Sequence, residues 1–109
     1  MNAKRMAPVA CRTMAEVRFA VDRLDEEIVV RLGERFRYMD AAARIKTSRR
    51  AVRDEGRKAQ VLANVGALAR QEGLPPAVAG ELYEALIEAS IAYELELFDK
   101  MHGSDSAAQ

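Results

Sequence analysis

The sequence is poor in the residues that build metal and covalent catalytic sites, with one cysteine, one histidine and no tryptophan among its 109 residues. Cys11 has no partner in the chain, which excludes an intrachain disulfide framework and is typical of a reducing compartment. Zinc-ligand spacing, a glycine-rich phosphate loop and a nucleophile motif are all missing from the sequence. We therefore expect no metal and no cofactor.

The chain also lacks a net charge, because 17 basic residues balance 17 acidic ones. Neutrality argues against a general nucleic-acid binder. No apolar run is long enough to span a membrane or to form the core of a signal peptide. We expect a cytoplasmic protein with neither nucleic acid nor membrane as a partner.

What the sequence does have is a separation of charge along its length. Basic residues dominate between Arg44 and Lys58, whereas every charged residue from Glu81 to Asp99 is acidic. A basic segment in a neutral protein suits a small anionic ligand better than a polyanion. Two oppositely charged, solvated faces would produce the same pattern.

Apolar residues recur at helical spacing and no strand-like alternation persists, so we predict an all-α fold of three helices, a long first helix and two shorter ones. Capping residues, glycines and prolines give their bounds. The predicted helices run from Thr13 to about Lys46, from Asp54 to Gly73, and from Pro76 to Gly103. His102 is expected to be a C-terminal cap or a solvent-exposed residue.

One helical domain is expected at residues 13–103, between a flexible arm at 1–12 and a disordered tail at 104–109. The first helix would be about 50 Å long at 1.5 Å per residue. Two shorter helices cannot cover that length in a compact domain with a radius of gyration of about 13 Å. We therefore predict an intertwined helical-bundle homodimer with the long helices side by side.

Three cations on the first helix fit such a dimer. Arg35 and Lys46 are eleven residues apart, close to three turns, and share a face. Arg18 is seventeen residues from Arg35, a rise of about 25 Å, so the two cannot meet at one small ligand within one straight helix. In an antiparallel dimer, Arg18 of one subunit can approach Arg35 and Lys46 of the other.

Five stretches occur in an order and at spacings typical of one family: Val17-Arg18 with Leu24-Asp25, Gly33-Glu34-Arg35, Lys46, Val52-Arg53-Asp54 with Arg57, and Leu86-Ile87-Glu88-Ala89-Ser90 leading to position 94. On these stretches, residues 14–98 resemble the AroQ-type chorismate mutases. The resemblance implies a dicarboxylate substrate, in which Arg18 from the partner subunit binds one carboxylate and Arg35 the other. It also implies that Lys46 binds a carboxylate and the ether oxygen of the breaking bond.

The chemistry implied is consistent with these residue types. Guanidinium groups bind carboxylates bidentately. The rearrangement of chorismate to prephenate is intramolecular, so catalysis rests on holding a reactive conformer and stabilising charge on the ether oxygen. A million-fold acceleration corresponds to about 8 kcal/mol, which a few preorganised cationic donors could supply.

The resemblance also implies roles for residues of the second and third helices. Asp54 would contact the substrate hydroxyl, Arg57 would lie near the mouth of the site, and Ser90 would line it. Glu94 stands at the ether-oxygen position, where many members have glutamine, and it must be protonated to donate a hydrogen bond. We therefore expect activity to fall as pH rises and Glu94→Gln to flatten the profile. Lys58 stands where many mutases have a glutamate that contacts the substrate hydroxyl.

Three functions stay open on the sequence, with chorismate mutase preferred. The segments Tyr38–Ala42 and Ile45–Ser48 resemble the isochorismate pyruvate lyases, which share the fold and leave salicylate. A non-catalytic helical dimer that acts as a regulatory or binding module is the third, and burial of the cations would discriminate against it. A DNA-binding helix-turn-helix is disfavoured, because the third helix is acidic.

Overall fold

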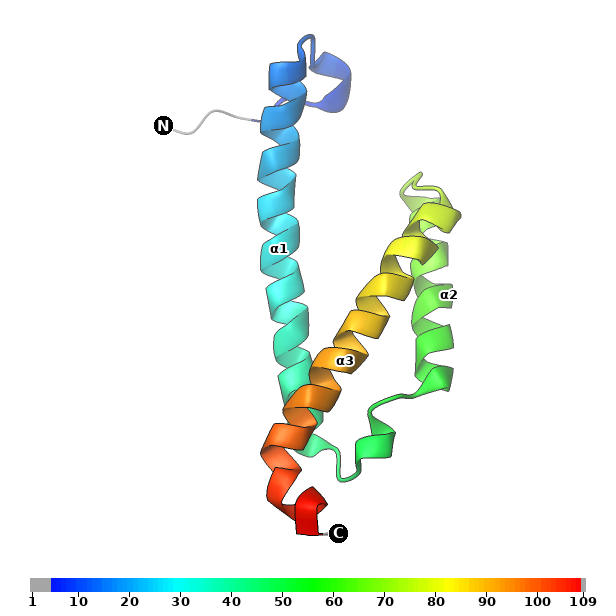
Figure 1. The fold of residues 1–109 in the computed structure, drawn as a ribbon. Coiled ribbons are helices and arrows are strands. Elements are labelled where there is room, and N and C mark those ends of the chain that lie inside the picture. The colour runs from blue at the N-terminus through cyan, green and yellow to red at the C-terminus, as the bar shows by residue number, and fades with distance from the viewer. Residues whose placement is uncertain (1–4, 109) are drawn as a thin grey trace. The chain divides into compact units, whose positions relative to one another are not determined.

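The computed structural model describes residues 5–108, and this range contains helices and turns but no strand. The helices are α1 (Met14–Ile45), α2 (Glu55–Gln71) and α3 (Pro76–Ala108), with short 3-10 helices η1 (Pro8–Ala10) and η2 (Arg49–Ala51) (Figure 1). The all-α class and the three helices are thereby confirmed. Residues 1–4 of the predicted arm and Gln109 of the predicted tail lie outside the described residues.

The chain divides within α1 into a first unit that ends at Arg37 and a second unit that begins at Tyr38. In the first unit, the Arg5 guanidinium in the N-terminal arm lies 2.7 Å from the Glu27 carboxylate on α1. The second unit contains the end of α1, η2, α2 and α3. Within it, α2 and α3 lie side by side (Figure 1).

The predicted capping box starts α1. The amide of Glu16 donates to Thr13 Oγ1 at 3.2 Å, and Glu16 Oε1 accepts from the amides of Thr13 at 3.2 Å and Arg12 at 2.7 Å. These bonds satisfy amides that have no carbonyl partner in the first turn of a helix. The predicted start of α1 is therefore confirmed.

The turn between α2 and α3 also agrees with the sequence signals. Gly73 has a φ of 73°, which favours glycine because a side chain is strained there. The amide of Leu74 donates to the carbonyl of Ala69 at 2.8 Å and closes the end of α2. Pro76 is the first residue of α3, where its missing N–H costs no hydrogen bond. The predicted stop and restart are confirmed.

The predicted end of α3 at Gly103 is wrong, because α3 continues to Ala108 and has 33 residues against 32 in α1. The description of the third helix as shorter is corrected with it. Gly103 does not have a positive φ, so it acts as an ordinary helical residue at a cost of about 1 kcal/mol. No proline lies between Gly103 and the last residue to stop the helix.

The core of the second unit is formed mainly by one face of α3. Ile87, Ile91 and Phe98 from α3 pack with Ala43 at the end of α1 and Val52 after η2. Burying a large aliphatic or aromatic side chain contributes roughly 1.5–3 kcal/mol. This core fixes the end of α1 and the start of α2 against α3.

Several apolar side chains of α1 are exposed. Val21, Leu24 and Ile28 are all exposed in the single chain. No described helix has the length and apolar character needed to cross a membrane.

Candidate functional site

Two polar residues interrupt the buried face of α3. Ser90 and Glu94 are each 4% exposed, and they are four residues apart, one turn of helix. The Ser90 hydroxyl donates to the Leu86 carbonyl at 2.7 Å. A glutamate is almost never fully buried unless a partner compensates its charge, so Glu94 marks the position of a specific interaction.

That partner is Lys46, the first residue after α1. Lys46 Nζ lies 2.8 Å from Glu94 Oε2, and the two side chains are 29% and 5% exposed. The distance is that of an ion pair, although Glu94 Oε2 has no partner in hydrogen-bond geometry among the described residues. The contact is an ion pair, because the Lys46 ammonium group can rotate a proton towards the Glu94 oxygen at this distance. The site thus holds a cation whose present partner a ligand could replace.

Further contacts hold the end of α1 and η2 on α3 around this pair. The Tyr93 hydroxyl donates to Asp40 Oδ1, and this hydrogen bond, together with burial, raises the pKa of Tyr93 above its ordinary value. Arg49 Nε donates to Asp99 Oδ1 at 2.9 Å. Because these contacts flank Glu94 in the sequence of α3, they restrict how far Lys46 can move from it.

His102 plays a part that the sequence did not predict. Its ring stacks on Phe98 with centroids 4.0 Å apart, and its Nε2 lies 3.3 Å from the carbonyl oxygen of Ala43. The imidazole therefore caps the end of α1 and not the end of its own helix, and it is half-buried. A cap that acts across two helices could not be inferred from one helix alone.

At the start of α2, two predicted site residues have local partners. Asp54 is the predicted N-cap, and its Oδ1 accepts from the amide of Arg57 at 2.9 Å. The Arg57 guanidinium donates to Gln60 Oε1 at 2.8 Å. Both residues are exposed. The capping role of Asp54 is confirmed, and the contacts of Asp54 and Arg57 with a substrate stay predictions.

A network of opposite charges connects the start of α2 to α3. Glu88 accepts from Arg53 Nη2 at 2.6 Å and from Lys58 Nζ at 2.8 Å, and Lys58 Nζ also donates to Glu84 at 2.7 Å. The hydrogen bonds from Arg53 and Lys58 lower the pKa of Glu88 from 4.5 to about 2. The hydrogen bonds to Glu88 and Glu55 raise the pKa of Arg53, and the hydrogen bonds to Glu84 and Glu88 raise the pKa of Lys58.

The sequence predicts a basic and an acidic segment but does not predict which of their residues pair. The missed signal is the spacing of Glu84 and Glu88, which places two carboxylates on one face of α3. Which cations they meet depends on how α2 aligns with α3, and a single sequence does not give that alignment.

The remaining predicted residues, Arg18 and Arg35, lie on α1 in the first unit. Arg18 is exposed and Arg35 is half-buried. The second unit brings together Lys46, Glu94 and, one turn away, Ser90. Participation of Arg18 and Arg35 in the same site stays a prediction.

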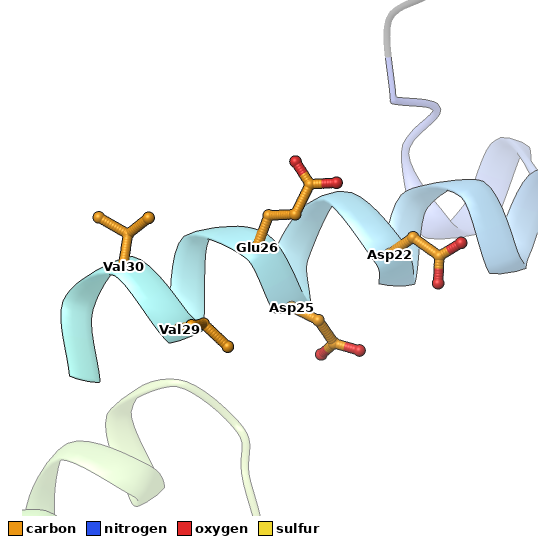
Figure 2. Close-up of a pocket in the computed structure, with 5 residues that line it drawn as sticks. All are labelled: Asp22, Asp25, Glu26, Val29 and Val30. Carbon is orange, nitrogen blue, oxygen red and sulfur yellow. The ribbon is translucent and has the colours of Figure 1, made fainter. Parts of the chain in front are cut away.

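A separate pocket on α1 is lined by three carboxylates and two valines. Figure 2 shows Glu26 and Val30 projecting from one side of the helix, and Asp22, Asp25 and Val29 from the other. In the described part of the chain, no group of three or more His, Cys, Asp or Glu residues is placed to hold a metal ion. Three carboxylates would repel an anionic ligand, so this surface is no candidate for the site.

Comparison with known proteins gives two results. The family model described as chorismate mutase type II matches residues 17–95. An isochorismate pyruvate lyase of Pseudomonas aeruginosa is 32% identical to the chain over 97 residues, which cover 89% of this chain and 96% of that protein. The family match contains every residue predicted for the site, from Arg18 to Glu94.

Proposed function

We propose that this chain, which belongs to the chorismate mutase type II family, rearranges chorismate to prephenate. The observation that carries the proposal is the buried contact of Lys46 with Glu94, with Ser90 on the same face of α3. A cation and a carboxyl group meeting at the edge of an apolar core supply a dry, polar position for the ether oxygen of the substrate.

The reaction requires no nucleophile and no group from outside. The ether C–O bond breaks while a C–C bond forms within one molecule, and no atom is gained or lost. Negative charge develops on the ether oxygen, and Lys46 Nζ can donate to it once the substrate has taken the place of Glu94 Oε2. Glu94, when protonated, supplies a second donor to the same oxygen. Dry surroundings strengthen both interactions relative to water.

We propose that Arg35 and the partner subunit's Arg18 bind the two carboxylates in a homodimer. The exposed apolar residues Val21, Leu24 and Ile28 on α1 support a dimer, because they need a covering surface. We propose that Asp54 contacts the substrate hydroxyl and that Arg57 lies near the mouth of the site. The protein is proposed to act in the cytoplasm.

An isochorismate pyruvate lyase is the second candidate, and the 32% identity to such an enzyme over nearly its whole length supports it. In that reaction the same type of ether bond breaks while a ring hydrogen moves to the enolpyruvyl carbon, which leaves salicylate and pyruvate. The same cations can serve both reactions, because each develops charge on the departing oxygen.

The test is an assay of the purified protein with chorismate and, separately, isochorismate, from mildly acidic to mildly basic pH, resolving prephenate from salicylate and pyruvate. We expect prephenate, formed faster at low pH, and a flatter profile in Glu94→Gln. A wild-type profile that does not vary with pH would overturn the role of Glu94. Salicylate from isochorismate would establish the lyase instead.

The same assay compares a variant of the site lysine with a matched control at an exposed lysine. Lys46→Met should lower kcat by about 100-fold or more, the loss typical of one preorganised donor. Lys100→Met removes a lysine from an exposed pair with Glu96 on α3 and should leave kcat unchanged. No turnover of either substrate by a folded wild-type protein would overturn both candidates and favour a binding module.

A further inference from the structure

Glu88 is placed to act on the site without touching the substrate. Its Oε1 lies 2.6 Å from Arg53 Nη2, while its Oε2 lies 3.1 Å from Arg53 Nη1 and 2.8 Å from Lys58 Nζ. One carboxylate thus holds a two-pronged guanidinium contact and an ammonium contact together. Two-pronged pairs of this kind fix orientation as well as position.

The two cations bracket the predicted substrate contacts on α2. Arg53 immediately precedes Asp54, and Lys58 comes immediately after Arg57. On the other side of the network, Glu88 is two residues from Ser90 and lies on the same helix as Glu94. The Glu88 carboxylate therefore links the turn at residues 54–57 to the part of α3 that carries Ser90 and Glu94.

The network is more than a set of isolated surface pairs. Each exposed ion pair alone contributes little to stability, but Lys58 is only 15% exposed and bonds to both Glu84 and Glu88. Arg53 is held from a second side by Glu55 at 2.9 Å. With its pKa lowered to about 2, Glu88 stays ionised at neutral pH.

We propose that Glu88 is a positioning residue, which fixes the turn of Asp54 and Arg57 against α3, the helix whose buried face carries Ser90 and Glu94. This proposal rests on the proposed function. The ammonium of Lys58 is held by Glu84 and Glu88, so it serves the scaffold that orients the turn.

The experiment compares Glu88→Gln with Glu96→Gln, a control on the same helix whose carboxylate lies 3.4 Å from the exposed Lys100. Glu88→Gln should raise KM about threefold to tenfold and change kcat by less than about twofold, because ground-state contacts loosen while Lys46 stays in place. Glu88→Asp keeps the charge and should give an intermediate KM. Glu96→Gln should match the wild type in both constants.

Amide hydrogen exchange of the substrate-free proteins separates this proposal from the proposed function. In Glu88→Gln the amides at residues 55–60 should exchange faster, and in Glu96→Gln they should not. Unchanged exchange overturns the positioning role, and so does faster exchange with an unchanged KM. If the wild type turns over neither substrate, the proposed function fails, and exchange alone still decides whether Glu88 holds the turn.

Discussion

Removing the ammonium of Lys46 should destabilise the fold, and the structure allows the loss to be worked out. In Lys46→Met, the Glu94 side chain, only 5% exposed, keeps its burial and loses its charge partner. Breaking a fully buried pair costs roughly 3–5 kcal/mol. Because Lys46 is 29% exposed, water can partly replace it, and we expect a loss of about 2–3 kcal/mol at neutral pH.

The loss can be measured by urea unfolding monitored by far-UV circular dichroism. Protein concentration must be the same for all variants, since dimer formation would add to the apparent stability. The exposed control Lys100→Met should stay within about 0.5 kcal/mol of the wild type. The double variant Lys46→Met with Glu94→Leu should regain most of the loss, because it buries no unpaired charge. Equal stabilities for Lys46→Met and Lys100→Met would refute the reasoning.

Three further predictions concern the start of α2, the charge network and the dimer. Asp54→Ala removes the acceptor of the N-cap hydrogen bond and should lower the free energy of unfolding, measured with urea, by about 1 kcal/mol. An unchanged free energy of unfolding would show that the cap does not stabilise the fold. The pKa of Glu88 is lowered to about 2 by folding, so its carboxylate stabilises the fold above pH 4.5 and loses that effect as pH falls towards 2. Glu88→Gln should therefore be less stable than the wild type at pH 7 and equally stable near pH 2 in unfolding experiments, and a difference independent of pH would contradict this. The variants Arg18→Ala and Lys46→Met should each be inactive alone and should regain about a quarter of wild-type activity when they are unfolded and refolded together. About half of the refolded dimers are then mixed, and each mixed dimer has one intact site out of two. No regain of activity would argue against a site shared between subunits.

The helix starts and the turn after α2 could be predicted because their signals are local. The reciprocal bonds of Thr13 and Glu16, the cap at Asp54 and the positive φ of Gly73 involve residues within a few positions of one another. Gly103 misled the prediction because glycine permits a positive φ without requiring one. Whether a glycine stops a helix depends also on the residues after it, such as the two prolines that come soon after Gly73.

The buried face of α3 was harder to predict. Val78 and Leu82 recur at helical spacing in the sequence, but both are exposed in the chain, whereas Ile87 and Ile91 are buried. The helix is apolar on more than one face, and periodicity does not say which face packs against the same chain. The face that stays exposed is available for the partner subunit that we propose.

The residues of the candidate site were also easier to predict than the contacts between them. Spacing along α1 singled out Lys46, and the family resemblance singled out Glu94 and Ser90, but the contact between Lys46 and Glu94 depends on how α1 and α3 pack. The family resemblance implies that Glu94 is a protonated donor to the ether oxygen. The structure has it buried and paired with a lysine.

The separation of charge seen in the sequence has two different consequences in the fold. Arg53 and Lys58 meet carboxylates of α3 that are at least 40% exposed, so water partly screens these pairs. Lys46 meets a carboxylate that is only 5% exposed, where an uncompensated charge would be strongly destabilising. A dianionic substrate that takes Lys46 from an ionised Glu94 would leave a buried carboxylate facing further negative charge. The protonation of Glu94 that we propose would remove that repulsion and provide a hydrogen for the ether oxygen. The proposed fall of activity with rising pH, and its absence in Glu94→Gln, would follow if the substrate takes Lys46 from Glu94 in this way.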